Sequence, residues 1–181
     1  MRILLAVASA HGSTREIAAA IMDELRAAAL SVDMADADAV DDLSPYGAVI
    51  LGSAVYAGHW LPAASQFAAR HRDALASRPL WVFSSGPIAA LAPPSPHELH
   101  QLAVPLAALP VRDHQLFGGK LDRQNLGLIE RVIALVVRAP SGDFRDWDAI
   151  HSWARTIAAS LCDQPAGAAG DSARAAGEEA P

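Results

Sequence analysis

Apolar segments of strand length alternate along the chain with segments of helical period, and this alternation constrains the fold more than any other feature. Five strands are expected, at 2–8, 31–35, 47–53, 79–85 and 112–119. The first is almost continuously apolar, as expected of a strand that is covered on both faces. Strands that are separated by helices form βαβ units and a parallel sheet. The sequence therefore predicts an α/β fold with a doubly wound, five-stranded parallel sheet.

The helices between these strands follow from the spacing of their apolar residues. Ile17, Ile21 and Leu25 recur at helical intervals and predict a helix over 14–29. Pro62 is typical of the first turn of a helix. The buried face of that helix is expected to use Ala64, Phe67, His71 and Leu75. Further helices are predicted at 95–106, near 124–138 and at 147–161.

The composition indicates one domain and excludes a nucleic-acid-binding surface. The 181 residues are 52% hydrophobic, which is enough for one sizeable core, and the net charge of -6 is opposite to the basic footprint of nucleic-acid-binding domains. A single cysteine, and no pattern of a secretory signal, favour a cytoplasmic protein. We expect one domain over 1–162, with an insert at 120–144. The Ala- and Gly-rich tail at 163–181 is expected to be disordered.

Three loops are expected to meet where the strands end. They are "SAHGST" (9–14), "GSAVYAGHW" (52–60) and "SSGPIAALAPPSP" (84–96). In open α/β sheets, ligands bind beyond the carboxyl ends of the strands, near the point where the strand order reverses. These loops are therefore the predicted ligand site.

The first loop has the groups that bind an anion. With one glycine and no lysine, it matches neither a dinucleotide-binding loop nor a nucleotide-hydrolysing P-loop. Ser13 and Glu16 have capping-box spacing, which predicts free backbone N–H groups at a helix start, where the dipole favours an anion. Gly12 would let the backbone approach closely. Other donors are Ser9, Ser13, Thr14 and His11. The alternative, equally weighted on this loop alone, is a plain helix cap and turn.

The first loop also carries a resemblance to a known family. "SAHGST" resembles the flavodoxin phosphate loop T/S-x-T-G-x-T, with Ser9, Gly12 and Thr14 matching and His11 replacing the middle threonine. "YGAVILGSAVYAGHWLPAASQFAARHRDAL", with its Gly58-His59 pair, is similar to the flavodoxin-like menaquinone-dependent protoporphyrinogen oxidases. "FGGKLDRQNLGLIERVIALVVRAPSGDFRDWDAIHSWARTIA" resembles the inserted helix and the tryptophan-bearing last helix of that group. The resemblance covers roughly residues 2–161. It implies a flavodoxin-like fold, with strand order 2-1-3-4-5 and a helix inserted near the fifth strand.

The resemblance implies non-covalently bound FMN, with its phosphate on the first loop. Tyr56 or Trp60 would stack on the flavin ring. His59 is the predicted catalytic residue, because imidazole exchanges protons near neutral pH. No metal site is expected, because the pair His97 and His100 lacks a third ligand. The implied cofactor contacts are Ser9, Ala10, His11, Gly12, Ser13, Thr14, Ser53, Ala54, Val55, Tyr56, Ala57, Gly58, Trp60, Ser84, Ser85 and Gly86.

The third loop separates two kinds of redox protein. Flavodoxin carriers typically have an aromatic residue and acidic side chains in this loop, whereas residues 84–97 contain no Asp, Glu or Tyr. Electrostatic docking on a protein partner therefore has little basis here, and an apolar quinone fits better. We predict an FMN-dependent oxidoreductase that acts between a small organic substrate and a quinone, with protoporphyrinogen IX as the substrate that the resemblance implies. The alternatives are a one-electron carrier and a non-redox binding module whose phosphate loop is blocked by His11.

The helix expected at 124–138 has an apolar arc of about 200°. It is too short to span a membrane. Basic residues on and beside it would support contact with a membrane surface: Lys120, Arg123, Arg131 and Arg138. Burial of the arc, or a seam between two copies of the chain in a homodimer, is the favoured interpretation, and contact with lipid or quinone is the alternative.

Overall fold

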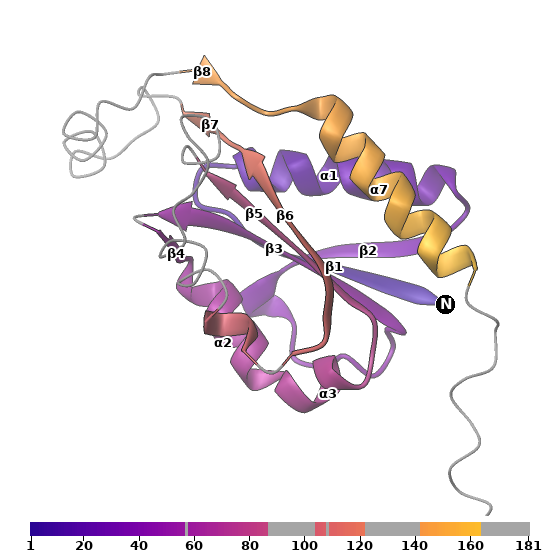
Figure 1. The fold of residues 1–181 in the computed structure, drawn as a ribbon. Coiled ribbons are helices and arrows are strands. Elements are labelled where there is room, and N and C mark those ends of the chain that lie inside the picture. The colour runs from indigo at the N-terminus through magenta and orange to yellow at the C-terminus, as the bar shows by residue number, and fades with distance from the viewer. Residues whose placement is uncertain (57, 87–103, 108, 122–141, 164–181) are drawn as a thin grey trace, which may run out of the picture.

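A parallel sheet forms the centre of the protein in the computed structural model, which describes residues 1–56, 58–86, 104–107, 109–121 and 142–163 (Figure 1). The strand order is β2-β1-β3-β5-β6, and β4 pairs antiparallel with β3. The bounds are β1 Arg2–Ala8, β2 Ser31–Asp36, β3 Ala48–Tyr56, β4 His59–Trp60, β5 Leu80–Gly86 and β6 Val111–Gly118. With β5 and β6 as the fourth and fifth parallel strands, the predicted order 2-1-3-4-5 is confirmed.

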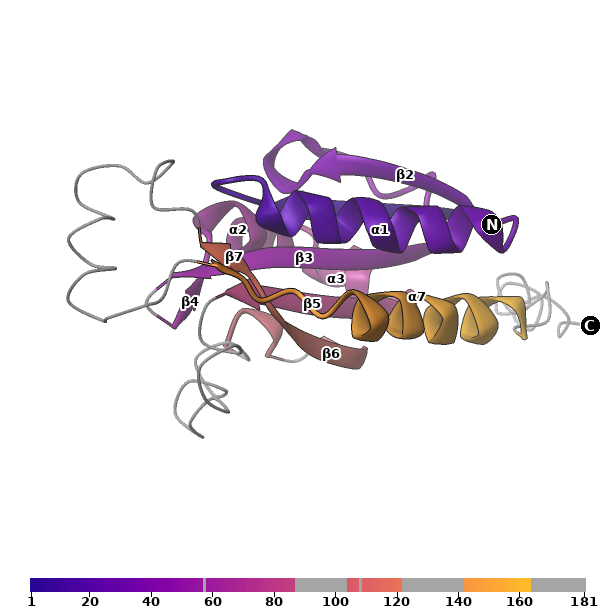
Figure 2. The same cartoon turned by 90° about the horizontal axis from the view of Figure 1, so that it is seen from above.

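Helices cover both faces of the sheet. One face is covered by α1 (Ser13–Ala27) and α7 (Trp147–Cys162), which lie side by side in Figure 2. The other face is covered by α2 (Pro62–Arg70) and α3 (Arg72–Ala76), with the 3-10 turns η1 (Ala37–Ala39) and η2 (Val104–Leu106). Alternate residues of β1 enter the two cores, as side chains on a strand must: Ile3, Leu5 and Val7 face α1, and Leu4, Ala6 and Ala8 face α2.

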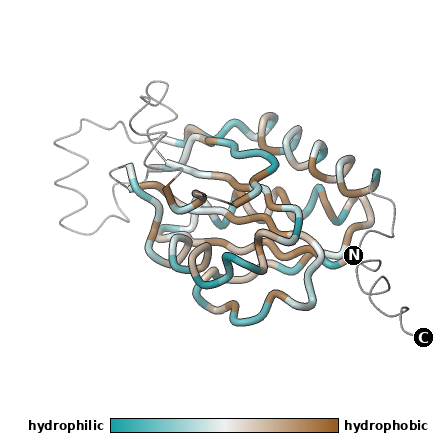
Figure 3. The backbone as a smooth tube through the Cα atoms, turned by 60° about the horizontal axis from the view of Figure 1, so that its bottom comes forward, coloured by the Kyte–Doolittle hydropathy of each residue, from teal (hydrophilic) through white to brown (hydrophobic). Residues whose placement is uncertain are grey.

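The distribution of hydropathy agrees with this layering. Figure 3 shows hydrophobic stretches along the central strands, and hydrophobic and hydrophilic residues alternating along the helices. Each helix buries one stripe and exposes the other, as surface helices of a layered protein do. None of the helices in the described ranges is long and apolar enough to cross a membrane.

The predicted helices at 14–29 and 147–161 are confirmed within two residues, but the helix after Pro62 is divided. It ends at Arg70, and α3 begins at Arg72, although the four predicted core residues Ala64, Phe67, His71 and Leu75 are all buried. The ring of His71 lies 3.1 Å from the carbonyl oxygen of Val40. Most of the helix expected at 95–106, all of that at 124–138, and the tail after Asp163 lie outside the described residues.

The two ends of the predicted insert lie together. Strand β7 (Lys120–Leu121) pairs antiparallel with β8 (Gly142–Asp143). The segment that follows β8 runs so close to β6 that a Cβ atom on Gly118 would lie 2.0 Å from the carbonyl oxygen of Phe144. The chain therefore leaves the sheet after β6 and returns to the same place before α7.

Candidate functional site

The described parts of the three loops predicted to form the site meet at the carboxyl edge of the sheet, and residues 87–96 of the third loop lie outside the described residues. The parallel register places Ser53 beside Ser84, and a hydrogen bond of 2.8 Å joins the hydroxyls of Thr14 and Ser85. Both Thr14 and Ser85 are buried. The first and third loops are thus connected beneath the surface, although they are more than 70 residues apart in sequence.

The first loop is shaped by Gly12, which adopts a left-handed φ of 84°. Its N–H donates to the Ser9 hydroxyl at 3.1 Å, and its carbonyl accepts from the N–H of Glu16 at 2.9 Å. Helix geometry leaves the N–H groups of Ser13, Thr14 and Arg15 without acceptors inside α1. An anion at this point would meet these donors and the positive end of the helix dipole.

The capping box expected from Ser13 and Glu16 is wrong. The residue before the helix is Gly12, no side chain caps α1, and Ser13 is already helical. The Ser13 hydroxyl instead accepts from the backbone N–H of Lys120 at 2.9 Å, and the Glu16 carboxylate pairs with Arg145. Ser13 therefore contacts the first residue of the predicted insert and Glu16 contacts the residue that follows it, so neither side chain caps the helix start.

The second loop is a tight hairpin. Strands β3 and β4 pair Val55 with Trp60 and Tyr56 with His59, and Gly58 at the tip has a φ of 79°. The base of the hairpin is fixed by the Ser53 hydroxyl, which accepts from the N–H of Leu61 at 3.1 Å. Ala57, also a predicted contact, lies outside the described residues.

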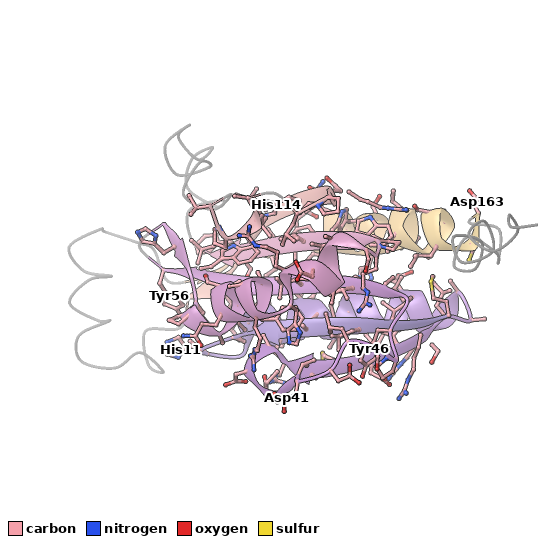
Figure 4. The ribbon with its side chains drawn as sticks, turned by 90° about the horizontal axis from the view of Figure 1, so that it is seen from below. His11, Asp41, Tyr46, Tyr56, His114 and Asp163 are labelled. Atoms are coloured by element: carbon pink, nitrogen blue, oxygen red, sulfur yellow. The ribbon has the colours of Figure 1, made fainter. Side chains whose placement is uncertain are left out.

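The aromatic side chains of the hairpin occupy different places. Tyr56 is 39% exposed, and its ring lies edge-on to that of His11, with centroids 6.1 Å apart. Figure 4 shows both residues at the same end of the sheet. Trp60 is buried, and its indole N–H donates to the Ser84 hydroxyl at 2.8 Å. Trp60 thus supports the hairpin from below, and Tyr56 and the exposed His59 are at the surface.

The end of β5 closes the site from the third side. Ser84 and Ser85 are both buried, and each hydroxyl contacts a side chain from another loop. At Gly86 an added Cβ would lie 3.1 Å from the carbonyl oxygen of Val55, so the two strands approach closely there. The backbone of this short segment is consequently held from several directions.

His114, on β6, is a site residue that the sequence analysis missed. Its Nε2 lies 2.9 Å from the Ser84 hydroxyl, and its ring lies edge-on to Trp60 at 6.2 Å (Figure 4). Burial lowers the pKa of His114, and the neighbouring carboxylate of Asp113 only partly opposes this. Since residues two apart on a strand share a face, Leu116, which packs on the α2 side, could have predicted that His114 lies on that face. The contact with Ser84 could not be predicted, because it depends on the register between β5 and β6.

Arg145 was missed as well. Its side chain is 5% exposed, its guanidinium pairs with Glu16 and Asp143, and it lies over the Trp147 ring at 4.5 Å. The hydrogen bond with Asp143, at 2.7 Å, is the main cause that raises the pKa of Arg145, and the same bond lowers the pKa of Asp143. This ion cluster attaches the end of the insert to the first turn of α1.

The comparison with family models identifies the class of the protein. A model described as flavodoxin domain matches residues 4–148. Since this match covers most of the chain, the protein belongs to the flavodoxin domain family. Among curated proteins no significant match is found.

Solved structures agree on the fold. A flavodoxin of Streptococcus pneumoniae TIGR4 has a TM-score of 0.60 at 17% identity, covering 88% of this chain and 99% of its own. An archaeal flavodoxin has a TM-score of 0.59 at 14% identity, covering 90% and 99%. The rubredoxin oxygen:oxidoreductase of Desulfovibrio gigas has a TM-score of 0.59 at 17% identity, and this chain, of which 89% is covered, spans only 36% of that enzyme. Identities this low establish the flavodoxin-like fold alone.

Family membership makes FMN the cofactor of this site, and the residues present fit it. The turn at Gly12 leaves open space, since an added Cβ there would meet nothing within 4 Å. This turn adjoins the start of α1, whose first N–H groups have no acceptor within the helix, and such donors suit a phosphate. His11, which replaces a threonine of the family pattern, is exposed beside Tyr56, and the turn beside it remains open. Within the described ranges, no group of three His, Cys, Asp or Glu side chains could hold a metal ion.

Proposed function

We propose that the protein is an FMN-dependent oxidoreductase that moves two electrons and two protons from a small organic substrate to a quinone, which becomes a quinol. When bound, FMN supplies the two-electron chemistry. The chain's own residues would bind the cofactor, cover one face of its ring and move a proton. A cytoplasmic location is part of the proposal.

The observation that carries this proposal is the absence of carboxylates from the sequences of the three loops predicted to form the site. Residues 9–14, 53–60 and 84–97 contain neither Asp nor Glu. Among the described rim residues, His11, Tyr56 and His59 are exposed. A rim of this kind favours a neutral organic acceptor over a protein partner that would dock through complementary charge.

Each part of the site has a proposed role. The turn from Ser9 to Thr14 would hold the phosphate through backbone N–H groups, with Ser9 and Ser13 adding hydroxyl donors. Tyr56 would stack on the cofactor ring, since it is the exposed aromatic residue of the hairpin. His59 lies one residue beyond the left-handed Gly58 and is exposed, which suits a side chain that exchanges protons with substrate.

Protoporphyrinogen IX is the proposed substrate. Support comes from the resemblance of residues 46–75, with their Gly58-His59 pair, to the menaquinone-dependent protoporphyrinogen oxidases. The segment at 124–138 is proposed to contact a membrane surface or a second copy of the chain. A quinone dissolved in lipid would be reached most directly in the first case.

Anaerobic turnover of protoporphyrinogen IX with menadione tests the proposal. The FMN-loaded wild type should reduce menadione, and His59→Gln should lower turnover by about 100-fold, the lower end for loss of a general acid–base group, with FMN affinity retained. His151→Gln, on α7, is the control. Unchanged turnover in His59→Gln would remove His59 from the mechanism.

Two other outcomes would favour the alternatives. A wild type that binds FMN and exchanges single electrons with a small redox protein, but reduces no quinone, is a one-electron carrier. A wild type that is purified colourless and takes up no added FMN is a binding module. Either result would overturn the proposed reaction.

A further inference from the structure

The Ser84 hydroxyl connects two side chains that come from different strands. It lies 2.8 Å from the indole nitrogen of Trp60 and 2.9 Å from Nε2 of His114. Ser84 is 1% exposed and Trp60 is 6% exposed, so the bond between them is shielded from water, while His114 is half-buried. Three residues from β4, β5 and β6 thus form one chain of hydrogen bonds, which is buried at Ser84 and Trp60 and partly buried at His114.

The number of hydrogens fixes the direction of this chain. An indole nitrogen is a donor only, so the Ser84 oxygen accepts from Trp60. The single hydrogen of the Ser84 hydroxyl then has Nε2 of His114 as its acceptor, provided that this nitrogen is unprotonated. A proton on Nε2 would leave the Ser84 hydrogen without an acceptor among the described residues, and a buried unpaired donor is costly. Burial of His114, which lowers its pKa, favours the same neutral form.

This chain ends on the hairpin that faces the ligand. Trp60 pairs with Val55 in the β3–β4 hairpin, whose next pair is Tyr56 with His59. The His114 ring also contacts Trp60 edge-on. His114 lies on the other side of β5 from this hairpin, so among the described residues its path to Tyr56 and His59 runs through Ser84 and Trp60.

We propose that His114 is a positioning residue for the FMN site: through the Ser84 hydroxyl it holds Trp60, and with it the hairpin that presents Tyr56 and His59. This inference rests on FMN as the ligand of the site. It predicts that the acceptor atom of His114, rather than the bulk of its ring, sets the affinity for FMN.

The test compares His114→Phe, which keeps a ring beside Trp60 but has no acceptor, with His114→Gln, whose side-chain oxygen can accept at the same place. FMN affinity is measured by fluorescence titration. The indole N–H signal of Trp60 is measured by NMR of the ligand-free protein and is assigned from its absence in Trp60→Phe. His114→Phe should weaken FMN binding by about ten-fold, the loss expected for one neutral hydrogen bond, and shift the indole signal. His114→Gln should stay within about two-fold of the wild type.

The double variant separates positioning from packing. In a Trp60→Phe background, His114→Phe should cost no more than about a further two-fold, because the chain is already broken. His151→Phe, on α7, is the control and should leave both the FMN affinity and the indole N–H signal of Trp60 unchanged. An equal loss in both backgrounds, or an unchanged indole signal in His114→Phe, would overturn the inference. If the wild type failed to bind FMN, the assignment of FMN would fall separately, and an unshifted indole signal would still overturn the hydrogen-bond chain.

Discussion

The turn at Ser9–Thr14, which we propose binds the phosphate, and the β3–β4 hairpin lie at the same edge of the sheet but are built differently. The turn is formed by backbone: Gly12 with its left-handed φ, and the open start of α1. The hairpin is fixed by side chains, with Ser53 holding Leu61 and Ser84 holding Trp60. A site made of backbone is expected to tolerate a change such as histidine for threonine at His11. A loop held by side chains depends on residues far away in sequence.

A single buried hydrogen bond joins these two parts of the site. The hydroxyls of Thr14, in the first turn of α1, and Ser85, at the end of β5, lie 2.8 Å apart. Ser85 follows Ser84, which holds the hairpin through Trp60. Because one hydrogen bond connects the two parts, a substitution in the turn should have only a small effect on the hairpin, and the reverse. Substitutions in each part can therefore test the difference between them.

The largest effect is expected from Gly12→Asp, which breaks the backbone-built part. The left-handed φ of 84° disfavours a side chain, and a carboxylate would repel the phosphate. FMN affinity should fall by more than about 100-fold, measured by fluorescence titration. Gly12→Asn is the matched control, because asparagine tolerates this conformation and carries no charge. A loss below about three-fold in Gly12→Asp would contradict the phosphate-loop assignment.

A smaller effect is expected from Thr14→Val, which cuts the connection between the two parts. The substitution leaves the buried Ser85 hydroxyl without its partner and should lower the free energy of unfolding by about 1–3 kcal/mol, measured by urea denaturation. The double variant Thr14→Val with Ser85→Ala should regain part of this loss. Thr156→Val, at an exposed site on α7, should stay within about 0.5 kcal/mol. A loss in Thr14→Val no larger than that in the control Thr156→Val would argue against the Thr14–Ser85 bond.

The smallest effect is a pH dependence that arises from His114 in the side-chain-built part. Burial lowers the pKa of His114 in the folded protein, whereas the unfolded chain keeps the ordinary value of about 6.5. The unfolded state therefore takes up this proton first as the pH falls. The free energy of unfolding should be fully retained above about pH 6.5, decrease below it, and level off below the pKa of the folded state.

His114→Phe isolates this contribution. Among the described residues, the carboxylate of Asp113 is the charged group that acts on His114, while Ser84 and Trp60, its contacts from β5 and β4, do not titrate. The difference in unfolding free energy between wild type and His114→Phe should therefore shrink from about pH 7.5 to about pH 5.5. Parallel curves for the two proteins would show that His114 does not titrate in this way.

Within the described residues, the parallel strands of the sheet and the helices α1 and α7 could be predicted from the sequence, because periodicity carries them. The continuous apolar run of β1 and the helical spacing of Ile17, Ile21 and Leu25 are local patterns, and they predicted the strands and helices of the sheet. The strand order, in contrast, was predicted from the resemblance to flavodoxins. The break at His71 could not be predicted in this way, since the buried stripe of α2 continues through it into α3. A two-residue strand such as β4 is too short to have a period.

The site could be predicted in part, for a related physical reason. The glycine and hydroxyls of the first loop are adjacent in sequence, and so the turn was found. The roles of Ser13, Ser84 and Arg145 depend on partners more than 20 residues away, which only the tertiary packing decides. The spacing of Ser13 and Glu16 matches a capping box. The Ser13 hydroxyl instead accepts from the N–H of Lys120, and the Glu16 carboxylate pairs with Arg145.

The relative affinity for FMN and riboflavin tests the central claim most directly, because the two ligands differ only in the phosphate. If the phosphate lies on the turn at Gly12, the wild type should prefer FMN by at least about 100-fold, and Gly12→Asp should lose that preference while riboflavin affinity changes little. Equal affinities of the wild type for both ligands, or no binding of either, would contradict the account.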